Sequence, residues 1–301
     1  MRRLALYCFL SLIALAPAAW ASSITLLLSE NSGPYAEFAT TLREVLDNSR
    51  WKISIVSKSD RSEPSGAPPD LIISAGGEAL QRALASGSAT PIIATLLPRQ
   101  SYEKIIAQAG RERARTTAIY LDQPPARQAA FLRQLLPDQK RIGMLFSSET
   151  RGLAGQYRLA FKYAGMTLDS EDSDTPNTLL PAINALLPRV NVLLAIPDST
   201  IYKRDNIKAI LVTSYRHQRP VVAFSAPFVN AGALAALHTT PAQIARQTAD
   251  LINNMGTTLP APMSPSQFAI TINSNVAEAL GLSVPDETTI RRAMLAESEA
   301  R

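Results

Sequence analysis

NVLLAIPDSTIY, residues Asn191 to Tyr202, joins an uninterrupted apolar run to an abrupt polar loop. Val192 to Ile196 show no alternation of apolar and polar residues, which is typical of a parallel strand covered by helices on both faces. Asp198, Ser199 and Thr200 follow at once, and these residue types favour a helix start at the mouth of an α/β sheet. The stretch therefore predicts a buried strand that ends at a ligand crevice.

Three pairs of segments recur in the same order in the two halves of the chain. The pairs are ITLLLSENSG from Ile24 with IGMLFSSETR from Ile142, PDLIISAGGEA from Pro69 with RVNVLLAIPDST from Arg189, and TPIIATLLP from Thr90 with RPVVAFSAP from Arg219. Strands separated by helices at this rhythm predict an α/β protein with two doubly wound parallel sheets. If the halves face each other, six polar loops meet in one cleft.

The two expected lobes are each discontinuous in sequence. Pro241 to Asn253 forms an amphipathic pattern, and Phe268 to Ile272 reads as a strand, so the chain continues after the second sheet. We assign residues 22–118 plus 236–262 to the N-terminal lobe and residues 119–235 plus 263–295 to the C-terminal lobe. Several crossings between lobes predict a hinge.

Residues 1–21 have the features of a secretory signal peptide. Two arginines precede an apolar run that ends in the small-x-small pattern Ala19-Trp20-Ala21. We therefore expect an exported, periplasmic protein. Cys8, the one cysteine, lies inside the apolar run, so a lipoprotein is not expected, and the mature chain would have no disulfide or thiolate.

The composition excludes several classes of function. Without the leader, 28 basic and 25 acidic residues remain, and no nucleic-acid partner is expected from this near balance. Glycine-rich phosphate motifs and the G-x-S-x-G elbow do not occur. His217 and His238 lack metal-ligand spacing and are expected to be surface or packing residues. We expect no enzyme activity, no cofactor and no metal site.

Candidate ligand contacts come from the loops after the predicted strands. Backbone N–H groups at helix starts suit a carboxylate, and acids at the same mouth suit an ammonium, so a small zwitterion with an apolar or aromatic group fits. The candidates are Ser29, Glu30, Ser32, Gly76, Gly77, Glu78, Phe146, Ser147, Ser148, Asp198, Ser199, Thr200 and Ser225. Asp198 is the first of them. The alternatives stay open that the Asp198 loop only caps a helix and that Phe146 belongs to the core.

Segments along nearly the whole expected mature chain carry a resemblance to a known family. They are PDLIISAGGEALQRAL, LRQLLPDQKRIGMLFSSE, NVLLAIPDSTIY, RPVVAFS, GALAALHTTPAQIARQTADLI and FAITINSNVAEALGLSVPD. The chain resembles the periplasmic substrate-binding proteins of ABC transporters, in the family that includes tryptophan and tyrosine binders.

The resemblance implies a type I periplasmic-binding-protein fold. It implies a protein that closes on a small organic ligand, such as an aromatic amino acid, and presents it to an inner-membrane permease. We expect the protein to be a monomer. A periplasmic module that feeds a membrane signalling receptor is the alternative.

The chain departs from that family at the ligand loops. Relatives often have Asn-Pro-Ser-Glu where this chain has Ser147-Ser148-Glu149, and Asp-Asn where it has Asp198-Ser199. A Thr-Asp-Pro-like turn is replaced by Leu96-Leu97-Pro98, and an acidic residue is common near Ser225. The positions that form the scaffold match the family, while the loop positions that are expected to contact the ligand differ from it.

Overall fold

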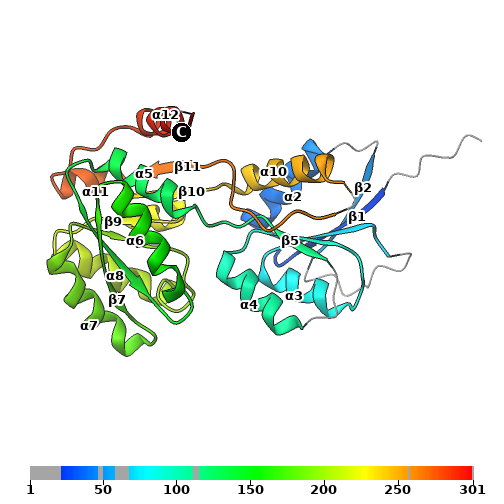
Figure 1. The fold of residues 1–301 in the computed structure, drawn as a ribbon, viewed down its shortest axis with the longest axis horizontal. Helices are drawn as coiled ribbons and strands as arrows, with labels where there is room; N and C mark the ends of the chain where they lie inside the picture. Colours follow the sequence, from blue (N-terminus) through cyan, green and yellow to red (C-terminus); the bar gives the residue numbers. More distant parts are fainter. Residues whose placement is uncertain (1–21, 47–49, 58–67, 111–114, 257, 300–301) are drawn as a thin grey trace, which may run out of the picture.

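Figure 1 shows two α/β lobes that lie beside each other, joined by several crossing segments. The structure is a computed structural model, and it describes residues 22–46, 50–57, 68–110, 115–256 and 258–299. The expected signal peptide, with Cys8, lies outside the described residues. Among the helices that the structure describes, none combines the length and the apolar character needed to span a bilayer.

The first lobe is built on a five-stranded parallel sheet in the order β2-β1-β3-β4-β5. Its strands are β1 (Ser22–Leu28), β2 (Trp51–Val56), β3 (Leu71–Ala75), β4 (Ile92–Thr95) and β5 (Thr116–Ala118). Its helices are α2 (Pro34–Val45), α3 (Gly77–Ala85), α4 (Arg99–Ala109) and α10 (Pro241–Asn254). Phe38 of α2 and Ile244 of α10 pack on one face of the sheet, and Leu80 of α3 and Ile105 of α4 pack on the other.

The second lobe has a six-stranded sheet in the order β11-β10-β9-β8-β6-β7, parallel except for the β10–β11 pair. Its strands are β6 (Arg141–Phe146), β7 (Thr167–Asp172), β8 (Val192–Leu194), β9 (Val221–Ala223), β10 (Ala235–His238) and β11 (Ala269–Ile272).

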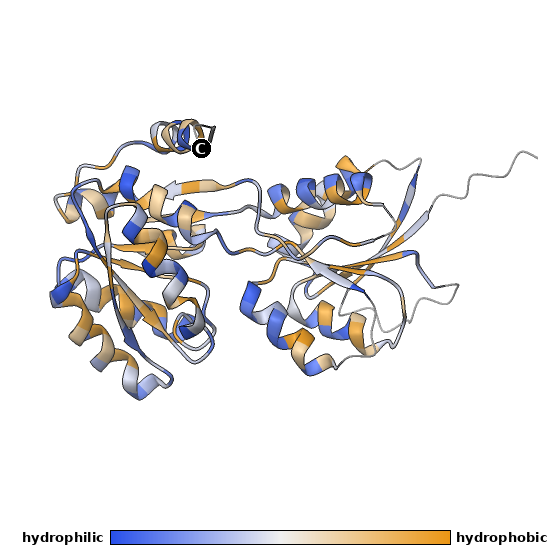
Figure 2. Ribbon diagram, viewed as in Figure 1, coloured by the Kyte–Doolittle hydropathy of each residue, from blue (hydrophilic) through white to orange (hydrophobic). Residues whose placement is uncertain are grey.

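The helices of the second lobe cover both faces of its sheet. They are α5 (Pro125–Leu135), α6 (Ala154–Tyr163), α7 (Pro176–Leu186), α8 (Arg204–Arg216), α9 (Ala226–Asn230), α11 (Ser274–Ala279) and α12 (Glu287–Glu299), with the 3-10 turns η1 (Arg151–Leu153) and η2 (Leu187–Arg189). Phe131 of α5 and Ile290 of α12 belong to the core on one face, and Ile183 of α7 and Ile210 of α8 to the core on the other. In Figure 2 the inner strands of both sheets are largely orange, as burial of both sheet faces requires, while blue segments lie on the outer helices and on the edge strand β7.

Three segments cross between the lobes and are joined by side chains. Gln123 Nε2, in the first crossing, donates to Thr239 Oγ1 in the second at 2.5 Å. Thr239 Oγ1 donates in turn to the backbone oxygen of Gln267 in the third at 3.2 Å. The guanidinium groups of Arg127 and Arg291 lie 5.5 and 5.4 Å from the centroid of the Phe268 ring. These crossings form a side-chain-linked hinge.

Strand pairing places the lobe boundary slightly differently from the sequence expectation. The expected first-lobe segment from residue 236 begins inside β10, and Ala236 to His238 pair with β11 of the second sheet. The chain therefore leaves the second lobe at Thr239, where the hinge hydrogen bonds lie.

Candidate ligand cleft

Two pockets lie between the lobes, and each takes its walls from both. The first, here the apolar pocket, has a volume of about 630 Å³ and is lined by Gly33, Pro34, Tyr35, Glu37, Leu96, Pro98, Leu121, Pro197, Phe224, Ser225, Ala226, Pro227, His238, Thr239, Thr240 and Pro241. The second, here the polar pocket, has about 600 Å³ and is lined by Arg99, Gln100, Glu103, Lys104, Ser148, Glu149, Gly152, Leu153, Gln156, Ser199 and Thr200. Both volumes lie in the usual range of small-molecule sites.

Aromatic and aliphatic side chains form the walls of the apolar pocket. Tyr35 extends from the first turn of α2, and Phe224 follows β9 on the opposite lobe. The Phe224 ring packs edge-on against Tyr202 and Phe228, at centroid distances of 5.9 and 5.7 Å. Leu96 has φ of 54°, a left-handed backbone that a leucine rarely adopts and that a structural or functional constraint must hold.

Burial keeps two ionisable side chains of the apolar pocket, His238 and Tyr35, in their neutral forms. Burial lowers the pKa of His238, so its imidazole is neutral near pH 7, and its Nε2 lies 3.0 Å from Thr271 Oγ1. Burial, followed by Glu30 and Glu78, raises the pKa of Tyr35, which keeps its phenol neutral. Glu37 also lines this pocket, and its Oε1 accepts the Ala242 N–H at 3.3 Å at the start of α10. No lysine or arginine lines this pocket among the described residues.

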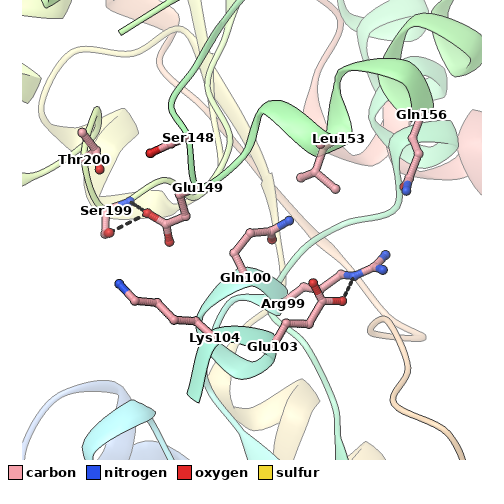
Figure 3. A pocket seen from close by; sticks show the side chains of 11 residues that line it. Arg99, Gln100, Glu103, Lys104, Ser148, Glu149, Leu153, Gln156, Ser199 and Thr200 are labelled. Atoms are coloured by element: carbon pink, nitrogen blue, oxygen red, sulfur yellow. Dashed lines mark hydrogen bonds and ion pairs between the residues drawn. The ribbon is translucent and has the colours of Figure 1, made fainter. Parts of the chain in front are cut away.

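Charged side chains of both signs face the polar pocket (Figure 3). Arg99 Nε pairs with Glu103 Oε1 at 2.6 Å, one turn further along α4. On the other lobe, Glu149 Oε2 accepts the Ser199 hydroxyl at 2.6 Å and the Ser199 N–H at 3.1 Å. The pocket can therefore offer donors and acceptors to a charged group.

Asp198 and Ser147 lie just beneath the polar pocket and bind each other. Asp198 is only 5% exposed, and its Oδ2 accepts hydrogen bonds from the hydroxyls of Ser147 and Thr150, both at 2.6 Å. Its Oδ1 accepts the N–H groups of Thr200 and Ile201, both at 2.9 Å. Four donors thus surround this carboxylate, which holds the loop after β8 to the loop after β6.

At the carboxyl ends of β1 and β3 in the first lobe, side chains of that lobe pack closely against one another. Ser29 Oγ accepts the Ala79 N–H of α3 at 3.0 Å and is buried. Gly76 has φ of 92°, and a Cβ there would lie 2.5 Å from Ser29 Oγ and 2.9 Å from the Tyr35 ring. This close approach requires glycine and seats Tyr35 against the backbone at the strand end.

The thirteen residues proposed from the sequence are divided among different environments. Ser148, Ser199 and Thr200 line the polar pocket, and Ser225 lines the apolar one. Phe146, 1% exposed, belongs to the core. The others, outside both linings, are Ser29, Glu30, Ser32, Gly76, Gly77, Glu78, Ser147 and Asp198.

Several residues that line the two pockets, Tyr35 and Phe224 among them, are not among the thirteen candidates from the sequence. Leu121 lies on a crossing segment, His238 is the last residue of β10, and Lys104 lies in the second turn of α4. Tyr35 follows the strand expected from ITLLLSENSG, and Phe224 lies at the end of the strand expected from RPVVAFSAP. This place at a strand end is the sequence signal that could have pointed to both. Nothing short of the lobe arrangement indicates the others. Among the described residues no three His, Cys, Asp or Glu side chains gather as a metal site would require.

Solved structures share this fold at low sequence identity. A conserved domain protein from Vibrio cholerae is 19% identical with a TM-score of 0.59, covering 92% of this chain and 98% of that one. An ABC domain from Streptococcus pneumonia, in complex with L-Trp, is 16% identical with a TM-score of 0.61, covering 90% and 98%. An open, ligand-free substrate-binding protein with adhesive properties from Clostridium difficile is 16% identical with a TM-score of 0.66, covering 88% and 96%.

The predicted type I periplasmic-binding-protein fold is confirmed by these neighbours and by the two parallel-dominated sheets. No curated protein matches the sequence. The family described as ABC transporter substrate binding protein matches residues 62–294, and the chain, with its two-lobed cleft, belongs to that family.

Proposed function

We propose that the chain is the solute-binding component of a periplasmic import system, and that its lobes close on a small organic molecule with an aromatic or apolar group. An aromatic amino acid is the first choice of ligand. The observation that carries this proposal is the apolar pocket, whose 630 Å³ are enclosed by both lobes and by two hinge crossings. A ligand that touches both lobes stabilises the closed state, because it gains these contacts only on closure.

The protein acts by binding and closure rather than by catalysis. Asp198, the most buried acid among the candidates, is occupied by four donors, and His238 holds Thr271 at the pocket edge. Neither stands in the nucleophile and base arrangement that acyl transfer or hydrolysis needs. The closed form would then be recognised by a membrane permease.

A ligand screen tests this function directly. The protein is heated with single amino acids and related metabolites, and each rise in melting temperature is confirmed by calorimetry. We expect aromatic amino acids among the compounds that bind. Phe224→Ala should then weaken binding by about tenfold or more, because a buried aromatic contact is lost.

A matched control separates pocket contacts from general effects. Tyr215, on α8, is 50% exposed and lies outside both pockets, so Tyr215→Ala should leave the affinity unchanged. Equal affinity of wild type and Phe224→Ala for every ligand found would contradict the assignment of the apolar pocket.

A further inference from the structure

Lys104 is the cation of the polar pocket that lacks a partner within the described part of the chain. Arg99 is paired with Glu103 on the same helix. No described residue hydrogen-bonds or pairs with Lys104 Nζ, and the Lys104 side chain is exposed. In Figure 3 its ammonium points across the cavity towards Ser199 and Glu149 of the other lobe.

The polar pocket continues the apolar pocket along the same cleft. On the first lobe, Pro98 lines the apolar pocket and Arg99 the polar one; on the second lobe, Pro197 and Ser199 are divided in the same way. The cleft therefore changes from apolar to charged over one or two residues on each wall. Since no lysine or arginine lines the described apolar pocket, a ligand carboxylate finds its cation only at the polar end.

We propose that Lys104 is the anion anchor of the cleft and that its ligands are amphipathic carboxylates, with the apolar or aromatic group in the apolar pocket and the carboxylate on Lys104. This rests on the proposed function, because it requires the cleft to bind a small organic solute. Closure excludes water around the ammonium and strengthens its pairing with the carboxylate.

The acids near Lys104 fit this arrangement. Glu103 is paired with Arg99, and Glu149 is fixed on the far wall through the two Ser199 hydrogen bonds to Oε2. Figure 3 shows the second oxygen of Glu149 turned towards the cavity. A ligand with an ammonium next to its carboxylate would meet that oxygen while the carboxylate meets Lys104.

Calorimetry with two matched pairs of probes tests the anchor. The pairs are L-tryptophan with L-tryptophanamide, and indole-3-propionate with indole-3-propionamide, so each amide lacks only the carboxylate charge. Wild type should bind each acid about tenfold more tightly than its amide. Lys104→Gln should abolish this preference, and Lys104→Arg should keep most of it. Lys162→Gln, an exposed lysine of α6 outside both pockets, should change nothing.

Two results would overturn the anchor and leave the proposed function intact. One is a preference for the acids that survives in Lys104→Gln. The other is an equal loss of affinity for acid and amide in that variant, which would show that Lys104 acts on lobe closure instead of on the ligand. If wild type binds none of the four compounds, the aromatic ligand class and the anchor both fail.

Discussion

Ser147 donates a 2.6 Å hydrogen bond from its hydroxyl to Oδ2 of Asp198, and both side chains are buried. Thr150 donates to the same oxygen, and two backbone N–H groups donate to Oδ1. The pair connects the ends of two neighbouring strands, β6 and β8, at the floor of the polar pocket. Asp198 therefore has a structural role that is independent of any ligand.

Asp198→Ala should lower the free energy of unfolding by about 3 kcal/mol, because four donors lose their acceptor and some stay buried. Urea denaturation measures the loss. Asp205→Ala, an exposed acid in the first turn of α8, is the control and should cost a few tenths of a kcal/mol. Unchanged stability combined with lost ligand binding would instead make Asp198 a direct contact, as the sequence suggests.

Gly76→Ala should destabilise the protein by about 3 kcal/mol, since it adds left-handed backbone strain to a clash with Ser29 Oγ and the Tyr35 ring. Gly87→Ala isolates the strain, because Gly87 has φ of 67° and open space around the added Cβ. Its cost should be about 1 kcal/mol. Thermal and urea unfolding of both variants provide the comparison. An equal loss of unfolding free energy in the two variants would show that Tyr35 moves away from the added Cβ at no cost in stability.

The hinge hydrogen bond between Gln123 and Thr239 should appear as an interaction energy. Gln123→Ala and Thr239→Val are expected to be non-additive by about 1 kcal/mol in a double-mutant cycle of unfolding free energies. Thr116→Val, at the hydrogen bond with Tyr102 in the first lobe, should add to Gln123→Ala without coupling. A coupling of zero between Gln123 and Thr239 would remove the proposed link between crossings.

Asp122 should make stability depend on pH. Burial raises the pKa of its carboxyl from 3.8 to about 6, although its Oδ2 accepts the Arg99 N–H at the start of α4. Because the folded state favours the protonated acid, ionisation between about pH 4 and pH 6 costs the folded state stability.

The Asp122→Asn variant tests that dependence, because asparagine keeps the shape of the protonated acid. Relative to this variant, wild type should lose about 1 to 3 kcal/mol of unfolding free energy as the pH rises from 4 to 7. Asp138→Asn, at an exposed loop position after α5, is the control in the same urea titrations. If the difference in unfolding free energy between wild type and Asp122→Asn stays constant across these pH values, the raised pKa of Asp122 is contradicted.

Much of the fold could be predicted from sequence, because its parallel strands are buried on both faces and read as continuous apolar runs. Val192 to Leu194 is one such strand, fully buried in β8. The edge strand β7 has the polar sequence TLDSED and is half exposed, so it lacks that signal. Asp169 and Glu171 of this strand pair with Arg189 from η2, a contact over 18 to 20 residues that local pattern does not reveal.

The cleft was less predictable, because one residue type can cap, pack or bind. Asp198, Ser199 and Thr200 are consecutive, yet Asp198 turns inward while the other two line the polar pocket. Lys104 reads as a surface lysine of an amphipathic helix until the second lobe is placed opposite it. Tertiary arrangement decides these roles, and local sequence carries little of that information.

The position of α10 has a consequence for synthesis of the chain. All five strands of the first sheet precede residue 119, but Ile244, Ala245, Ala249 and Ile252 of α10 complete the core on one of its faces. A nascent chain that stops short of α10 would leave the apolar side of β1 and α2 open to water. The lobe that is translated first therefore completes its core only after most of the second lobe has been translated.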